Sequence, residues 1–87
     1  MLVTNRLGLH ARAAARLVRT ASAFKSSVRL ARADGGAAAD AKSILNVLLL
    51  AAARGTELLL MVEGRDEQAA LDAVCELFEH KFGEEQG

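Results

Sequence analysis

A histidine and an arginine stand two residues apart near the start of this sequence, at His10 and Arg12, directly after Gly8 and Leu9. An alanine-rich stretch follows them, so the pair lies where a helix is expected to begin. The first backbone N–H groups of a helix lack intrahelical partners and carry the positive end of its dipole, which attracts anions. The imidazole of His10 is a nucleophile, and the guanidinium of Arg12 matches phosphate oxygens. This combination predicts a site that carries a phosphoryl group.

The elements that must position this pair follow from the spacing of apolar and polar residues. Helices repeat apolar residues at intervals of three and four, whereas half-buried strands alternate apolar and polar residues. The turn-forming residues Asp34-Gly35-Gly36 separate two strands that we expect to pair in antiparallel fashion. The expected order is β-α-β-β-α-β-α, over residues 1–5, 11–23, 26–32, 37–41, 43–54, 56–63 and 64–82.

The apolar stretch after Ser43 fits either a buried strand or a helix. The serine at its start, the alanines at 51–53 and Gly55 as a C-cap favour the helix. Such a helix is apolar on nearly every side, so it cannot bury all of its faces in a two-layer domain. We therefore expect some of its leucines to form an exposed patch for a partner, from among Leu45, Leu48 and Leu49.

The last third of the chain is expected to add a strand and a helix to one core. The continuous apolar run Leu58–Val62 predicts a central strand. The helix that follows opens with carboxylates in its first turn, which suits its dipole. The tail from Glu84 onward is expected to be frayed, and residues 1–87 are expected to form a single α+β domain. The apolar face of the last helix should consist of Leu71, Val74, Phe78 and Phe82.

Composition excludes several classes of protein. Of the 87 residues, 52% are hydrophobic and 25% are charged, which is typical of an ordered folded domain. No run of about eighteen apolar residues and no signal-peptide pattern occurs, so neither membrane insertion nor export is expected. The single cysteine, Cys75, excludes an internal disulfide and favours a cytoplasmic location. We expect a monomer.

The net charge is zero, but the charges are unevenly distributed along the chain. Residues 1–54 contain nine Lys or Arg and two Asp or Glu, a net of +7, and residues 55–87 reverse these counts. The basic half could face an acidic partner or a nucleic acid, or the two halves could lie together and partly cancel. Nucleic acid is disfavoured because the chain has no Trp or Tyr to stack on bases. No cysteine or carboxylate pattern surrounds His80, which makes it a poor metal ligand, and neither a metal nor a cofactor is expected.

Three short motifs together resemble the HPr family, the histidine-containing phosphocarriers of the bacterial phosphoenolpyruvate-dependent sugar phosphotransferase system. They are Gly8-Leu9-His10-Ala11-Arg12, Ala41-Lys42-Ser43-Ile44 and Glu63-Gly64-Arg65-Asp66-Glu67-Gln68. The resemblance covers nearly the whole chain. It implies an open-faced β-sandwich, in which three helices cover one face of a four-stranded antiparallel sheet of order 1-4-2-3. It also implies a protein that is phosphorylated in transit rather than a stand-alone enzyme.

The resemblance also implies roles for individual residues. His10 would accept a phosphoryl group from phosphorylated Enzyme I and donate it to IIA domains of sugar permeases, and Arg12 would contact the phosphate. Ser43 matches a serine that an HPr kinase/phosphorylase modifies in some bacteria, and it also suits a helix N-cap. The alternative role is that of a nitrogen-branch (NPr-type) or regulatory relative whose phosphorylation state changes what it binds. The positions that dock Enzyme I and IIA partners correspond to Ala15, Arg19, Ile44, Leu45 and Leu48.

One residue beside the site departs from the family pattern, since Ala13 stands where proline is usual. Proline in the first turn is pre-organised for a helix, so alanine is expected to loosen this segment by about 0.4–1 kcal/mol. We therefore expect the alanine to bear on the rate of phosphorylation more than on its chemistry.

Overall fold

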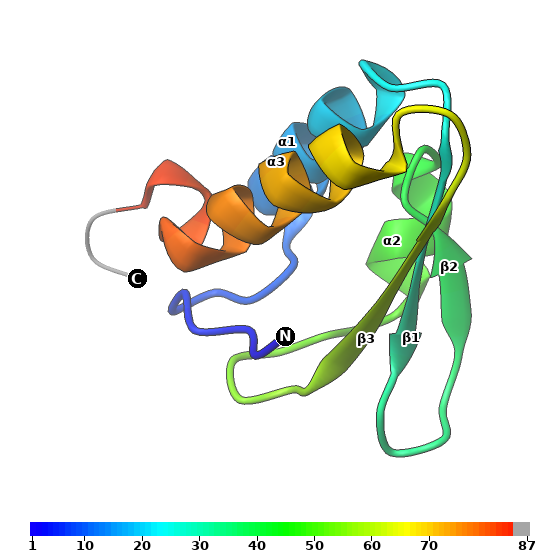
Figure 1. Ribbon diagram of the computed structural model, residues 1–87. Coiled ribbons are helices and arrows are strands. Elements are labelled where there is room, and N and C mark those ends of the chain that lie inside the picture. Colours follow the sequence, from blue (N-terminus) through cyan, green and yellow to red (C-terminus); the bar gives the residue numbers. More distant parts are fainter. Residues whose placement is uncertain (85–87) are drawn as a thin grey trace.

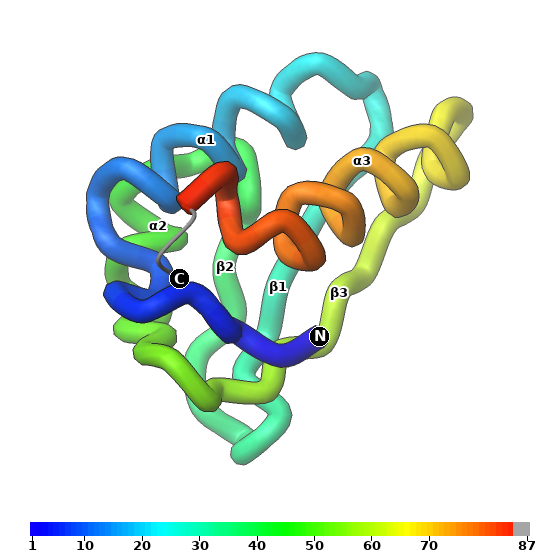
Figure 2. Tube along the Cα trace, turned by 90° about the vertical axis from the view of Figure 1, so that its left-hand side faces the viewer, coloured from blue at the N-terminus to red at the C-terminus, as the bar shows by residue number. Residues whose placement is uncertain are grey.

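The computed structural model describes residues 1–84 (Figure 1). Within these residues, three strands form one antiparallel sheet in the order β2-β1-β3, and the helices pack together on one of its faces. The helices α1 and α3 lie side by side, and α2 packs near β2 (Figures 1 and 2). This is an α+β open-faced sandwich. Its elements are α1 (Ala11–Ser22), β1 (Ser27–Arg32), β2 (Ala38–Asp40), α2 (Ile44–Leu49), β3 (Leu58–Glu63), α3 (Glu67–Glu79) and the 3-10 helix η1 (Lys81–Gly83).

Strand β1 shows why one face of the sheet is buried. Val28 and Leu30 are fully buried, while Arg29 between them is exposed, as the alternation of side chains along a strand requires. Leu30 pairs with Ala39 of β2 and with Leu60 of β3, which brings apolar side chains together on the covered face. The strand expected here is confirmed.

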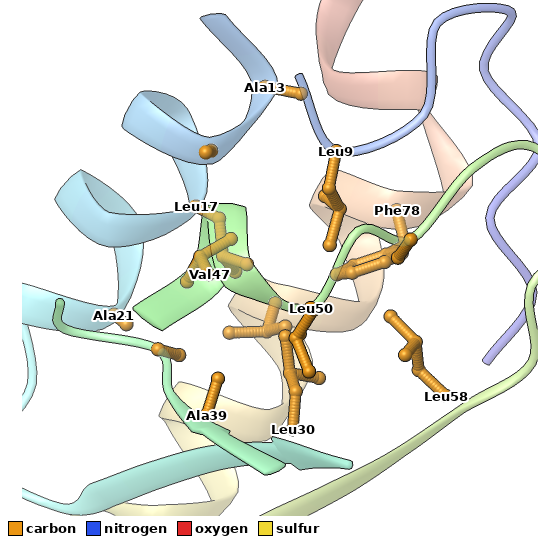
Figure 3. Packing of buried hydrophobic residues seen from close by; sticks show 14 of the residues in the cluster. Leu9, Ala13, Leu17, Ala21, Leu30, Ala39, Val47, Leu50, Leu58 and Phe78 are labelled. Carbon is orange, nitrogen blue, oxygen red and sulfur yellow. The ribbon is translucent and has the colours of Figure 1, made fainter. Parts of the chain in front are cut away.

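The core lies between this face and the helices (Figure 3). Leu17 of α1, Val47 of α2 and Leu30 of β1 are fully buried. Leu50 and Phe78 are also buried and belong to the same cluster. Complete burial of one such aliphatic side chain stabilises a fold by about 1.5–3 kcal/mol. No helix within residues 1–84 combines the length and the apolar character needed to cross a membrane.

The N-terminal segment is not the first strand of a four-stranded sheet, so that prediction is wrong for the described residues. Residues 1–5 make one isolated antiparallel bridge, between Leu2 and Glu57. Val3 is fully buried and hydrogen-bonds with the turn that precedes β3, and of β3 itself only its first residue, Leu58, exchanges backbone hydrogen bonds with this segment, at Met1. The chain then bends at residues 5–7 to reach His10, which leaves too few extended residues for a strand.

Helix α2 is shorter than the sequence predicts. It ends at Leu49 instead of continuing through the alanines at 51–53, so Gly55 is not its C-cap. Ala51 adopts the left-handed backbone conformation, with φ of +50°, and this reverses the chain direction directly after the helix. The predicted helix is therefore confirmed in type and wrong in length.

Contacts from distant residues explain where α2 stops. The last carbonyls of a helix lack helical partners and need other donors. Arg32 of β1 donates to the carbonyls of Leu50 at 3.0 Å and Ala51 at 3.3 Å, and its positive charge suits the C-terminal end of the dipole. The Leu9 N–H donates to the Ala52 carbonyl at 2.9 Å. These bonds satisfy the carbonyls that a longer helix would have used internally.

Strand β3 lies at an edge of the three-stranded sheet, and β1 lies in its middle, so the prediction that β3 is central is wrong for residues 1–84. Leu58 at its start is fully buried, but Leu59 and Met61 are exposed. Alternation places every second residue on the uncovered face of the sheet whatever its hydrophobicity. An apolar run alone therefore does not reveal whether both faces of a strand are covered.

Helix α3 ends at Glu79, so Phe82 does not belong to its apolar face as predicted. Val74 and Phe78 are buried on that face, and Leu71 is half-buried. Phe82 lies in η1, with φ of +58°, and is nevertheless buried. Its ring meets the ring of Phe78 edge-on at a centroid distance of 4.8 Å.

The tail that the sequence predicts to be frayed begins inside the described residues. Glu84 is held by hydrogen bonds to Asn5 and His10, so the prediction is wrong for this residue. Residues 85–87, the rest of the expected tail, lie outside the described residues.

Asp66 ties the N-terminal end of α3 to the segment that precedes β1. Its carboxylate accepts hydrogen bonds from the Ser26 hydroxyl at 2.5 Å and from the N–H groups of Lys25 and Ser26. The hydrogen bond from the Ser26 hydroxyl, followed by that from the Lys25 N–H, lowers the pKa of Asp66 to about 2. Ionised Asp66 therefore stabilises the fold at neutral pH.

This contribution should be lost in acid, as the pH falls from about 4, where an unfolded aspartate titrates, to about 2. Asp66→Asn is expected to lower the Tm at pH 7 and to flatten the decrease in Tm between these two pH values. Thermal melts followed by circular dichroism at several pH values measure both effects. Asp72→Asn, on the exposed side of α3, is the matched control and should keep the slope of the unmodified chain. An unchanged slope in Asp66→Asn would contradict the assignment.

Candidate functional site

His10 is the N-cap of α1, and its extended backbone (φ −76°, ψ −179°) leads the chain into the helix. The Ala14 N–H donates to the His10 carbonyl at 2.8 Å, which forms the first helical hydrogen bond. The three N–H groups before it, of residues 11–13, have no place in the helical ladder. Free backbone donors and the positive end of the dipole therefore follow directly after the histidine.

Gly8 and Leu9 fix the approach to His10. Gly8 has φ of +66°, and a Cβ on it would lie 2.5 Å from the carbonyl oxygen of Ala52, so no larger residue fits here without displacing the backbone. The Leu9 side chain is buried in the core, and its N–H bonds to the same carbonyl. The motif thus anchors the loop before His10 onto the segment that follows α2.

The imidazole of His10 lies at the edge of an open hollow of about 210 Å³, which is lined by Leu7, Leu9, His10 and residues 51–53. Its side chain is 25% exposed, so a partner can reach it. Nε2 lies 2.6 Å from Oε2 of Glu84. Nδ1 has no hydrogen-bond partner among residues 1–84. The ring is therefore held at one nitrogen and open at the other.

Glu84 is a site residue that reasoning from the sequence missed. Its Oε1 accepts a hydrogen bond from Nδ2 of Asn5 at 3.0 Å, while Oε2 faces His10. Burial raises its pKa, but the hydrogen bonds from Asn5 and His10, with the charges of His10 and Arg12, outweigh burial and lower the pKa below its usual value. No local pattern signals this role, because 74 positions separate Glu84 from His10 in the chain.

Arg12 lies in the first turn of α1 and is exposed. It has no hydrogen-bond partner in the part of the chain that the structure describes, so its guanidinium can bind an incoming anion. Its charge contributes to the lowered pKa of Glu84, whose carboxylate contacts His10. The structure thus brings together the histidine and the arginine that the sequence singles out.

Two other arginines among residues 1–54 are engaged in contacts within the protein. Arg16 of α1 donates to the Phe82 carbonyl, and Arg32 pairs with Asp34 at 2.9 Å. These two arginines do not contribute free charge to a continuous basic surface. Residues 1–84 contain no group of three His, Cys, Asp or Glu side chains placed to hold a metal ion.

Ser43 is the N-cap of α2, as the sequence predicts. Its side-chain oxygen accepts a hydrogen bond from the Asn46 N–H at 3.3 Å. A serine at this position satisfies one of the donors that a helix start leaves unpaired. Ser43 is half-buried and directly precedes the apolar residues of α2.

The predicted exposure of leucines on α2 is confirmed. Leu45 and Leu49 are 63% and 69% exposed, and Leu48 and Ile44 are also exposed. Val47, on the opposite side of the helix, is fully buried. We refer to the four exposed residues as the α2 patch. The two docking candidates on α1 differ, because Ala15 is half-buried and Arg19 is exposed.

Ala13, in the first turn of α1, is fully buried in the core. The residue that replaces the usual proline is therefore part of the helix itself rather than of the loop before it. An effect of this alanine on the rate of phosphorylation stays a prediction.

A nucleophilic ring at a helix N-terminus, an exposed cation beside it and an exposed apolar helix face define a phosphoryl-carrying protein of the α+β class. Comparison with known proteins agrees with this class. A family model described as "PTS HPr component phosphorylation site" matches residues 1–80. The chain belongs to the HPr family, the phosphocarriers of the phosphotransferase system.

Individual relatives support the same assignment. The phosphocarrier protein HPr of Xylella fastidiosa is 48% identical over 85 residues, which cover 98% of this chain and 93% of the relative. That of Treponema pallidum is 51% identical over 83 residues, or 95% and 92% of the two chains. The phosphocarrier protein NPr of Shewanella violacea is 42% identical over 82 residues, or 94% and 88%. The crystal structure of HPr-C-His from Thermoanaerobacter tengcongensis is similar with a TM-score of 0.91 and 40% identity, over 98% and 93% of the chains.

Proposed function

We propose that His10 carries the phosphoryl group, accepting it from phosphorylated Enzyme I and passing it to IIA domains of sugar permeases. The observation that carries this proposal is the geometry of the ring, whose Nε2 is engaged by Glu84 while Nδ1 is open at a helix N-terminus. The lone pair of Nδ1 forms the new bond to phosphorus as the bond between phosphorus and the donor breaks. The electron pair of that bond leaves with the donor.

Arg12 and the start of α1 supply the electrostatic part of this transfer. The phosphoryl oxygens carry negative charge throughout, and catalysis of such transfers depends mainly on positioning and charge stabilisation. The exposed guanidinium of Arg12 and the free N–H groups of residues 11–13 are donors suited to these oxygens. An open site also suits a carrier, which must release the group as readily as it accepts it.

We infer that partners dock on the α2 patch and on the adjoining face of α1. The support for this is the exposure of apolar side chains, which a protein partner can cover. The contact of α1 with α2 makes their surfaces continuous. The docking residues we assign are Ala15, Arg19, Ile44, Leu45 and Leu48.

We further propose that Ser43 is a regulatory phosphorylation site for an HPr kinase/phosphorylase. A phosphate on this N-cap would be stabilised by the helix start but would place charge beside the α2 patch. Docking of Enzyme I should then weaken. Mass spectrometry after incubation with the kinase and ATP tests whether Ser43 is modified.

The experiment that tests the proposed function starts from phosphoenolpyruvate, purified sugar-branch Enzyme I and this protein. We expect one acid-labile phosphoryl group per chain, which mass spectrometry places on His10, and its fast relay to a sugar-specific IIA domain. A group found on another residue would contradict the assignment of His10.

Similarity to an NPr supports a second candidate function, as a carrier of the nitrogen branch. Uptake only from the nitrogen-branch Enzyme I would favour it.

Three further statements remain predictions from the sequence. They are the single domain over residues 1–87, the monomeric state and the cytoplasmic location. Light scattering coupled to size-exclusion chromatography measures the monomeric state directly.

A further inference from the structure

Glu84 and Asn5 form a connected hydrogen-bond network with the ring of His10. Oε2 of Glu84 lies 2.6 Å from Nε2 of His10, and Oε1 accepts from Nδ2 of Asn5 at 3.0 Å. The side chains of Glu84 and His10 are 14% and 25% exposed, so water competes little for these contacts. Both carboxylate oxygens are thus occupied, and the carboxylate has one orientation.

The segment before Glu84 is shaped to deliver this carboxylate to the site. The buried ring of Phe82 anchors it in the core, and Arg16 of α1 donates to the Phe82 carbonyl. Gly83 has φ of +78°, a backbone conformation that favours glycine, and a Cβ on it would displace the Arg16 guanidinium, which would lie 2.7 Å away. The N–H of Glu84 bonds back to the Lys81 carbonyl at 3.0 Å. Figure 2 shows this turn in red beside the start of α1.

Asn5 connects the same carboxylate to the loop before His10. The Asn5 side chain is fully buried, and its Nδ2 uses both protons, one to Glu84 and one to the Gly8 carbonyl at 2.7 Å. The Gly8 N–H in turn donates to the Asn5 carbonyl at 3.1 Å. A single buried amide therefore fixes the backbone just before His10 and the carboxylate that faces the ring.

We propose that Glu84, held by Asn5, is a positioning residue for phosphoryl transfer, which keeps the proton of His10 on Nε2 and the lone pair of Nδ1 directed outward. An ionised carboxylate only accepts hydrogen bonds, so a neutral ring in this contact must carry its proton on Nε2. The pKa of Glu84 is lowered, although burial opposes this, and the carboxylate is therefore ionised at neutral pH. The inference rests on the proposed role of His10.

The network also suits the phosphorylated ring. When Nδ1 bonds to phosphorus and the Nε2 proton stays in place, the ring gains positive charge. Glu84 faces that charge at Nε2, while Arg12 and the helix start face the phosphoryl group. No proton has to leave the ring during transfer in either direction, which suits a group that must be both accepted and given up.

Glu84→Ala tests the proposal with two measurements that a purely structural role would not change together. We expect the kcat of uptake from phosphorylated Enzyme I to fall about 10–100-fold, because the ring is misplaced. The KM should change less than about twofold, because the α2 patch is intact. In ¹⁵N NMR under conditions in which the ring of His10 is neutral, the unmodified chain should show one ring N–H proton, bonded to Nε2. Glu84→Ala should lose this slowly exchanging proton and show a mixture of both tautomers.

Glu79→Ala is the matched control, since it removes an exposed carboxylate at the end of α3. It should keep the kcat and the ring signals of the unmodified chain. Asn5→Ala should lower kcat as well, and the double variant with Glu84→Ala should be no slower than Glu84→Ala alone. Thermal melts show whether Asn5→Ala folds. If it does not fold, the kcat and the ring signals of Glu84→Ala test the proposal without it.

An unchanged or raised kcat in Glu84→Ala, with unchanged ring signals, would overturn the positioning role. Failure of the proposed function looks different, because the unmodified chain would then carry no phosphoryl group on His10 in the same assay. The NMR measurement needs no phosphorylation, so it tests the contact between Glu84 and the ring in either case.

Discussion

Replacing His10 by alanine should abolish phosphoryl uptake from phosphoenolpyruvate and Enzyme I. Alanine offers no nucleophilic nitrogen, and nothing else at the start of α1 can form the bond to phosphorus. The fold should tolerate the change, because the His10 side chain makes no capping hydrogen bond and is partly exposed. Radiolabelled phosphoenolpyruvate with catalytic Enzyme I measures the uptake, and a thermal melt checks the fold.

His80→Ala is the matched control, because His80 is the other histidine of the chain and lies exposed at the end of α3. Its uptake should equal that of the unmodified chain. Full uptake by His10→Ala would show that the phosphoryl group is carried elsewhere, and the proposed mechanism would have to be abandoned.

The second large effect is expected from Phe82→Ala, which should lower the free energy of unfolding by about 3–5 kcal/mol. The ring is almost fully buried, and its edge-to-face contact with Phe78 is lost together with its buried area. Small domains are stable by only about 5–15 kcal/mol, so this loss is a large share of the total. Urea unfolding followed by circular dichroism measures it.

Phe24→Ala is a control of the same chemistry, since Phe24 is only half-buried at the margin of the core. It should cost clearly less than Phe82→Ala. Equal losses in the two variants would contradict the view that η1 is anchored in the core. If Phe82→Ala does not fold at 25 °C, Phe82→Leu provides a measurable value, because leucine retains much of the buried volume.

Phe82 also connects stability to the site. It precedes Glu84 by two residues, and its burial is what brings η1 back against α1. Phe82→Leu should therefore weaken the contact of Glu84 with His10 as well as the fold. Glu84→Ala, in contrast, should affect the ring and leave the packing of Phe82 in the core intact, so the two variants separate anchoring from positioning.

Local sequence was sufficient for much of the fold and for the central residues of the site. Side-chain periodicity depends only on neighbouring residues, and it predicted α1, β1 and the apolar nature of α2. The capping role of Ser43 and the placement of His10 and Arg12 at a helix start are equally local. The exposed leucines follow from a helix that has more apolar surface than one core can cover.

Apart from the central place expected for β3, the predictions that were wrong share a location, because each concerns a segment that packs around the loop before His10. Residues 1–5 bend there and contribute Asn5, and the segment after α2 is held by the Leu9 N–H. The chain after α3 returns there with Glu84. Each segment departs from its local preference because a hydrogen bond from a distant part of the chain satisfies its backbone or side chain instead.

The ring of His10 shows most directly which features the local sequence determines and which depend on tertiary contacts. Its position in the chain, beside Arg12 and before a helix, can be read from a few adjacent residues. Which nitrogen is open, and which residue holds the other, depends on a contact across 74 positions that no periodicity encodes. Packing of the buried Phe82 and the buried amide of Asn5 determines that contact, so only the tertiary structure contained this information.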